Sequence, residues 1–130
     1  MTKIKDTALD SFQYAISEYL LRNKSILDQM TKLESSNARI NRTLSKAVTH
    51  CGCLKVNASK QNYPEDMQPE KISTHLEGKI CPNCRDFLEK EIGHHLFYLA
   101  SLCNNLDLNL YDIIIKELER LNLLGKFNMR

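Results

Sequence analysis

The spacing of its cysteines constrains this chain more than any other feature of the sequence. Cys51-Gly-Cys53 and Cys81-Pro-Asn-Cys84 form two close pairs, with residues 54–80 between them. Each pair lets two thiolates approach one ion, and two pairs complete the tetrahedral set of four sulfur ligands typical of structural zinc. The total of five cysteines is odd, which argues against a disulfide framework. We therefore expect one metal ion to hold the two ends of this segment together.

Other interpretations of the cysteines stay open at this point. Four thiolates also suit an iron–sulfur cluster, and His50, next to Cys51, is an alternative ligand. The Cys81-x-x-Cys84 pair alone is also typical of thiol exchange, and four unrelated buried thiols would need no metal. Cys103 lies on an apolar helix face, so we expect it in the core.

The rest of the sequence favours helices over strands. The chain has 130 residues with only 4 Gly and 3 Pro, and apolar residues recur at steps of three and four. We predict an all-α bundle of four to five helices, with an irregular loop between the second and third main helices and a short strand or extended turn at Leu54–Ala58. The predicted helices are residues 7–22, 25–48, 82–105 and 110–122.

The apolar residues that recur every three or four positions define the side of each helix that is predicted to face the core. In the first two helices they are Ala8, Phe12, Ala15, Ile16, Tyr19 and Leu20, then Ile26, Met30, Leu33, Ala38, Ile40, Leu44 and Ala47 or Val48. In the last two they are Phe87, Leu88, Ile92, Leu96, Phe97, Leu99, Ala100 and Cys103, then Leu110, Ile113, Ile114, the stem of Glu117, Leu118 and Leu121.

Helix boundaries are marked by four residues. Pro82 suits the first turn of a helix. Asn109 is a predicted N-cap, with Asp112 as the acidic residue of the first turn. Gly125 is a predicted C-terminal stop.

The length, net charge and apolar runs of the sequence predict its domain count, its partners and its location. The length fits a single domain, 1–130, made of N-terminal helices (1–49), a metal-binding loop (50–84) and a C-terminal helix pair (82–124). The net charge of +2 is weak, so we do not expect nucleic acid to bind, although Arg39, Arg42 and Lys46 form a small basic stripe. No run reaches 18 apolar residues, and the N-terminus lacks a signal-peptide core. We expect a cytoplasmic protein without a membrane span.

One helix combines acidic and histidine residues with a long apolar run. Glu91 and His94 are three residues apart and share a helix face. A Glu-x-x-His pair can hold two iron or manganese ions when a facing helix supplies a second copy, and a dimer would have to supply it here. The simpler interpretation is a polar edge beside the core, with His94 or His95 partly buried and hydrogen-bonded.

The stretch from Lys90-Glu-Ile-Gly-His-His through Asn104-Asn-Leu-Asp-Leu-Asn-Leu resembles the hallmark helix of MazG-like all-α nucleoside triphosphate pyrophosphohydrolases. Tyr111–Asn122 is similar to the helix that follows it in that family, and the resemblance covers about residues 86–124. It implies a helical bundle that assembles as a dimer or tetramer. It also implies a Mg²⁺ site built from acidic residues on two helices.

The family pattern of acidic ligands is incomplete in this chain. Glu91 matches the first acid of the second motif, but His94 stands at the position of the following Asp. On the earlier helix Glu34 is the only acid near the expected place, and Asn37 and Asn41 stand where further acids are wanted. We therefore expect the family fold without a normal Mg²⁺ site.

Two functions follow. The first is a non-catalytic, zinc-binding helical module for interaction, assembly or nucleotide sensing, which forms a homo-oligomer and takes a protein or a nucleotide as its partner. The alternative is a nucleoside triphosphate pyrophosphohydrolase that uses Mg²⁺ or Mn²⁺ with altered ligands. Its candidate residues are Glu34, Glu89, Glu91, His94 and Asp112.

Overall fold

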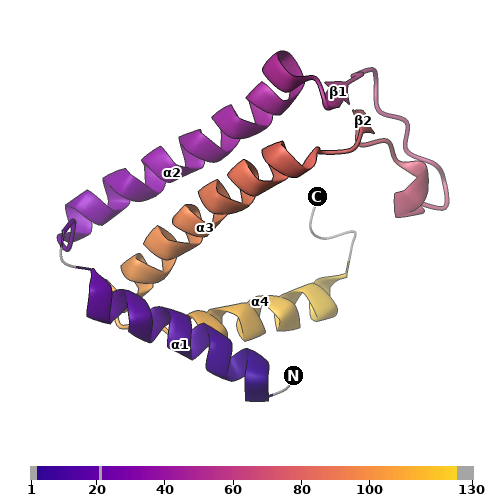
Figure 1. Cartoon of the computed structure of the whole chain (residues 1–130). Coiled ribbons are helices and arrows are strands. Elements are labelled where there is room, and N and C mark those ends of the chain that lie inside the picture. The colour runs from indigo at the N-terminus through magenta and orange to yellow at the C-terminus, as the bar shows by residue number, and fades with distance from the viewer. Residues whose placement is uncertain (1–2, 21, 126–130) are drawn as a thin grey trace. The chain divides into compact units, whose positions relative to one another are not determined.

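The computed structural model describes residues 3–20 and 22–125. Helices make up most of this part of the chain, and one small sheet is the only β structure within it (Figure 1). The helical class predicted from the sequence is therefore confirmed, while the family bundle stays a prediction. The elements in chain order are α1 (Lys3–Tyr19), α2 (Ile26–Lys46), η1 (Ala47–Cys51), β1 (Leu54–Val56), η2 (Pro69–Lys71), β2 (Leu76–Gly78), α3 (Pro82–Asn105) and α4 (Leu110–Leu124).

The chain divides into two compact units, which we describe separately. The first unit comprises Met1–Ser36 and His94–Arg130, and the second comprises Asn37–Gly93. Both α2 and α3 contribute residues to each unit. Within the described ranges, no helix has a stretch long and apolar enough to span a membrane.

The core of the first unit lies where α1, α3 and α4 meet. Its buried members are Ile16, Ala100, Cys103 and Leu110, and half-buried Leu9, Phe12, Leu20 and Phe97 pack against them. The prediction that Cys103 is a core residue is confirmed. Burying these side chains removes apolar surface from water, which is the main source of stability for the unit.

A buried glutamine ties α1 to the turn before α4. The Gln13 side chain donates hydrogen bonds to Asn104 Oδ1 at 2.9 Å and to the Leu108 carbonyl at 3.0 Å, and its oxygen accepts from the Leu110 N–H at 2.7 Å. Every hydrogen-bonding group of this amide therefore has a partner, which is what makes its burial tolerable.

Several predicted core faces are wrong in detail. In α1 the buried side includes Gln13 and Leu9, while Tyr19 is 81% exposed and Ala8 is also exposed. The other predicted members, Phe12, Ala15, Ile16 and Leu20, are buried or half-buried as expected. The hydrophobic pattern missed Gln13 because it assigned every polar residue to solvent.

In α2 the less exposed positions recur at alternating steps of three and four. They are Ile26, Gln29, Leu33, Ser36, Ile40 and Thr43, and the next step of four reaches Ala47 at the start of η1. Predicted core residues Met30, Ala38 and Leu44 are exposed instead. Polar Gln29 and Ser36 take the inner positions, so the apolar residues beside them point outward.

The outer sides of α3 and α4 are also more exposed than predicted. The predicted core residues that are exposed are Phe87, Ile92 and Leu96 in α3 and Ile113, Ile114, Leu118 and Leu121 in α4. Both helices carry apolar residues on more than one side, and the described chain covers only one of those sides.

The predicted helix-end residues Pro82, Asn109 and Gly125 are confirmed, whereas α1 spans Lys3–Tyr19 and not the predicted 7–22. Helix α3 begins at Pro82. The side chain of Asn109 accepts a hydrogen bond from the Asp112 N–H at 2.9 Å and so caps α4. Gly125 ends α4 with a positive φ, and its N–H donates to the Leu121 carbonyl.

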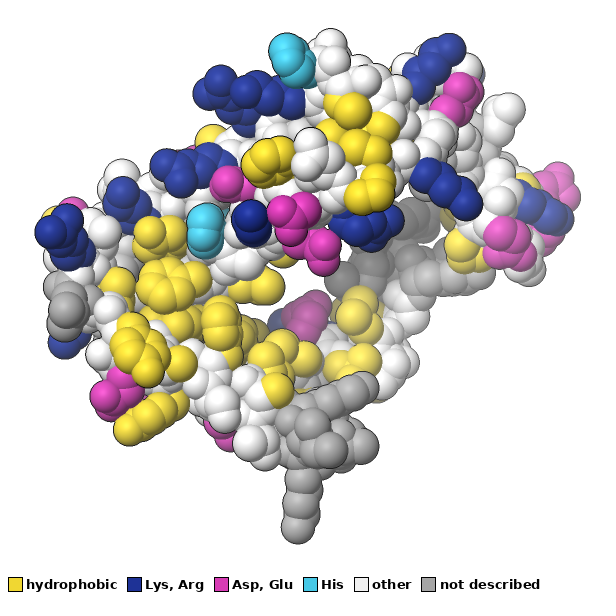
Figure 2. Space-filling model, viewed as in Figure 1, with side chains coloured by type: hydrophobic (Ala, Val, Ile, Leu, Met, Phe, Trp, Pro, Cys, Tyr) yellow, Lys and Arg dark blue, Asp and Glu magenta, His cyan; other side chains and the backbone are white. Residues whose placement is uncertain are grey.

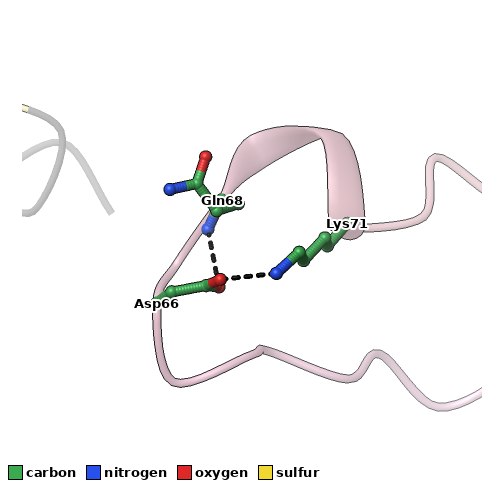
Figure 3. Close-up of polar contacts among 3 residues, drawn as sticks. All are labelled: Asp66, Gln68 and Lys71. Atoms are coloured by element: carbon green, nitrogen blue, oxygen red, sulfur yellow. Dashed lines mark hydrogen bonds and ion pairs between the residues drawn. The ribbon is translucent and has the colours of Figure 1, made fainter.

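In the second unit, a short hairpin fills part of the segment predicted as an irregular loop. Strands β1 and β2 pair antiparallel, with Leu54 opposite Gly78 and Val56 opposite Leu76. The loop between them is ordered locally around η2, where Asp66 accepts a hydrogen bond from the Gln68 N–H and pairs with Lys71 (Figure 3). The hairpin brings Cys53 and Cys81, at its two ends, toward each other.

Candidate metal centre

The four paired cysteines meet at one place in the second unit. Their Sγ atoms all lie within 4.8 Å of one another, and Cys51 Sγ is 3.9 Å from Cys81 Sγ. Cys51 ends η1 and Cys53 precedes β1, while Cys81 precedes α3 and Cys84 lies in its first turn. Cys51 is exposed and the other three are half-buried, and all four thiols are free. The sequence pattern thus identified the cluster.

Two glycines shape the backbone that presents these thiols. Gly52 adopts φ +80°, a left-handed conformation that turns the chain between Cys51 and Cys53. Gly78 adopts φ +85°, and a Cβ atom there would lie 2.6 Å from the Cys53 carbonyl oxygen. Any other residue at position 78 would push Cys53 away from its partners.

Cys81 acts as the N-cap of α3. Its carbonyl accepts from the Arg85 N–H at 2.9 Å, and its Sγ accepts from the Cys84 N–H at 3.4 Å. The hydrogen bond from the Cys84 backbone stabilises the thiolate and lowers the pKa of Cys81 to about 7. The pKa of Cys84 rises to about 12, chiefly because its thiol hydrogen-bonds to Cys81, with loss of hydration adding to the shift.

The donor set fits a single tetrahedral ion. Four sulfurs about 2.3 Å from a zinc ion stand about 3.8 Å apart, and the Cys51–Cys81 pair is already at 3.9 Å. In an iron–sulfur cluster the thiolates bind more than one iron, so they must stand farther apart than ligands of one ion. The separation of the Cys51 and Cys81 sulfur atoms is therefore the one expected for ligands of a single ion.

The other candidate residues do not join a comparable group. Within the described ranges, no second set of three or more His, Cys, Asp or Glu side chains converges on a point, and His50 is not part of the cysteine cluster. Glu34, His94 and Asp112 are exposed residues of the first unit. Glu89 and Glu91 belong to the second unit, where Glu89 is exposed and one Glu91 oxygen is buried without a hydrogen-bonding partner.

The sequence predicted only one member of a partly buried polar pair. Ser36 Oγ lies 2.9 Å from His95 Nδ1 and donates to the Leu33 carbonyl at 2.7 Å. Since the Ser36 proton is used on Leu33, His95 Nδ1 donates to Ser36. A partly buried, hydrogen-bonded residue was predicted at His94 or His95, and it is His95. No sequence signal identified Ser36 as its partner.

In metal-free, reduced protein we expect iodoacetamide to modify Cys81 before any other cysteine. At pH 7 about half of Cys81 is thiolate, whereas only about a hundredth of a cysteine with the ordinary thiol pKa of 9.0 is ionised. After the lower nucleophilicity of a more acidic thiolate is allowed for, the advantage is about fivefold. The rate should fall as pH drops below about 7, and peptide mass spectrometry gives the order. Buried Cys103 is the internal reference, and its modification ahead of Cys81 would contradict the assignment.

Comparison of the chain with protein-family models, curated proteins and solved structures finds no match. The geometry of the four cysteines is therefore the main indication of what this chain does.

Proposed function

We propose that the chain is a structural zinc protein in which Cys51, Cys53, Cys81 and Cys84 bind one Zn²⁺. The observation that carries the proposal is the convergence of the four Sγ atoms within 4.8 Å. Four thiolates fill the tetrahedral coordination of zinc and leave no open position for water or substrate. The ion therefore serves structure and not catalysis.

The structural role follows from where the ligands lie. Two come from the end of η1 and the turn after it, and two come from the start of α3. The ion joins the end of one long helix to the start of the next and closes the hairpin between them. Metal binding would then supply folding free energy to the second unit.

Cobalt substitution tests this coordination directly. Co²⁺ bound by four thiolates in a tetrahedral site absorbs visible light strongly, whereas octahedral Co²⁺ is nearly colourless. We expect metal-free protein to take up one Co²⁺ with intense visible bands, and added Zn²⁺ to bleach them. A weak octahedral spectrum would contradict a four-thiolate site.

The proposal also covers the helices around the site. We propose that they keep a MazG-like arrangement without its Mg²⁺ chemistry, so that the chain works by assembly or by binding a protein or a nucleotide. In support, the stretch that carries the resemblance, about residues 86–124, forms two consecutive helices, α3 and α4, and His94 replaces an acidic ligand. Hydrolysis of any nucleoside triphosphate with Mg²⁺ or Mn²⁺, abolished by Glu91→Gln, would favour the enzyme alternative.

Self-association is expected through α4. Ile113, Ile114, Leu118 and Leu121 are 40–49% exposed and recur along one side of the helix, and hydrophobic side chains reach the surface over α4 in Figure 2. Such patches mark protein contacts in soluble proteins.

We therefore predict that Leu118→Glu lowers the oligomeric state measured by light scattering after size exclusion. A charge placed in an apolar interface is costly to desolvate. Leu27→Glu, at a 70% exposed position of α2, is the matched control and should leave the state unchanged. A monomeric wild-type protein would contradict this prediction.

A further inference from the structure

A pocket opens beside the cysteine cluster in the second unit. Its volume is about 330 Å³, and α2, η1 and α3 line it. Its lining includes Thr43, Ala47 and Cys51 from α2 and η1, and Cys84 and Phe87 from α3. Phe87 is 55% exposed although it is aromatic. The pocket is at the small end of the range for ligand sites, so it suits one apolar side chain better than a large cofactor.

The α2 and η1 side of this pocket lies in a segment without acidic residues, whereas α3, on the other side, carries both acidic and basic residues. Residues 37–64 contain no Asp or Glu but five Lys and Arg: Arg39, Arg42, Lys46, Lys55 and Lys60. None of the five forms an ion pair with a described residue. Four thiolates around Zn²⁺ would carry two negative charges, so positive charge remains in surplus along this segment.

Three of these basic residues lie on α2, one of the helices that line the pocket. Arg39, Arg42 and Lys46 are exposed and follow one another at steps of three and four, which places them on one side of α2. Lys46 also lines the pocket itself. Figure 2 shows Lys and Arg side chains over α2 and hydrophobic side chains at the surface near η1 and β1.

We propose that this surface binds an acidic segment of a partner protein, with one apolar side chain in the pocket and carboxylates on Arg42 and Lys46. An apolar anchor at the centre and charged contacts at the rim are the usual division of labour in protein interfaces. A nucleic acid would need a larger basic footprint than these residues provide. The proposal goes beyond structural zinc binding, although Cys51 and Cys84 contribute to the pocket wall.

Fluorescence anisotropy on the full, zinc-loaded chain tests the proposal. The probe is a fluorescein-labelled 12-residue peptide of Glu and Leu with a central Phe. A peptide with Lys in place of Glu and a labelled 20-nucleotide oligothymidine are the comparison ligands. We expect the acidic peptide alone to bind, with an affinity that weakens as salt is added.

Matched variants distinguish binding in the pocket from non-specific attraction between opposite charges. Asn83→Trp should fill the pocket, since Asn83 is exposed and lines it. Lys46→Glu should reverse a rim charge. Each should weaken binding of the acidic peptide about tenfold, as loss of one anchoring contact does. Lys60→Glu and Tyr63→Ala change an exposed charge and an exposed aromatic residue outside the pocket, and they should have less than about a twofold effect.

Zinc content is measured on every variant, so failure of the metal site is distinguished from failure of the pocket. If Asn83→Trp loses zinc, the result for Lys46→Glu, at an exposed position, decides whether this surface binds the acidic peptide. No binding of the acidic peptide, equal binding of the lysine peptide, or full affinity in Lys46→Glu would overturn the proposal. Tighter binding of oligothymidine, weakened by Lys46→Glu, would overturn it in favour of a nucleic-acid surface.

Discussion

The Cys84→Ser variant is expected to lose its zinc and the order of the hairpin, while the first unit stays folded. A site with three thiolates and a hydroxyl binds zinc far more weakly, and the binding free energy of a structural zinc is folding free energy. A ligand present at about a thousandfold its dissociation constant stabilises the bound form by about 4 kcal/mol. Losing that stabilisation should make local opening of the second unit roughly a thousandfold more frequent.

Hydrogen exchange read residue by residue measures this effect. The Asn57 N–H, which donates to His75, and the Gly52 N–H, which donates to Ala47, should exchange much faster in the variant. The Leu110 N–H, held by Gln13 in the first unit, should keep its protection. Cys103→Ala is the control, because Cys103 belongs to the apolar core, and it should retain one zinc. Unchanged exchange at Asn57 after zinc is lost would mean that the hairpin folds without metal.

The Gln13→Leu variant is expected to destabilise the first unit by about 3 kcal/mol, which corresponds to a fall in melting temperature of roughly 10 °C. Leucine keeps the bulk of glutamine but makes none of its three hydrogen bonds. The buried Leu110 N–H would lose its acceptor, and Asn104 and the Leu108 carbonyl would each lose a donor. An unsatisfied buried polar group costs about 1–3 kcal/mol.

Gln29 provides the matched control. It is a glutamine of α2 with 1% exposure, and neither side-chain polar atom has a hydrogen-bonding partner among the described residues. Gln29→Leu should therefore raise the melting temperature, since it removes buried polar atoms that gain nothing in return. Chemical or thermal unfolding of the two variants, followed by circular dichroism, compares them. Equal destabilisation by both would contradict the assigned role of Gln13.

The sequence predicted those features that local chemistry determines. Pro82, Asn109 and Gly125 mark helix ends because each residue satisfies or ends the backbone pattern by itself. The cysteine pairs predicted their own convergence because neighbouring ligands can reach one ion whatever the fold between them.

Features that depend on tertiary contacts were not predictable in the same way. Gln13 and Ser36 are buried because particular partners accept and donate to them, and nothing in their local sequence names those partners. Tyr19 was placed in the core by its spacing, although 81% of it is exposed. The pocket beside Phe87 depends on how η1 turns at the end of α2, and periodicity carries no information about such a turn.

Native mass spectrometry of reduced protein purified without a metal-affinity tag, together with elemental analysis, is the most direct test of zinc binding by the four cysteines. We expect one zinc per chain, no iron, and no zinc in Cys84→Ser. Wild-type protein that carries no metal while its thiols are fully reduced would contradict this expectation.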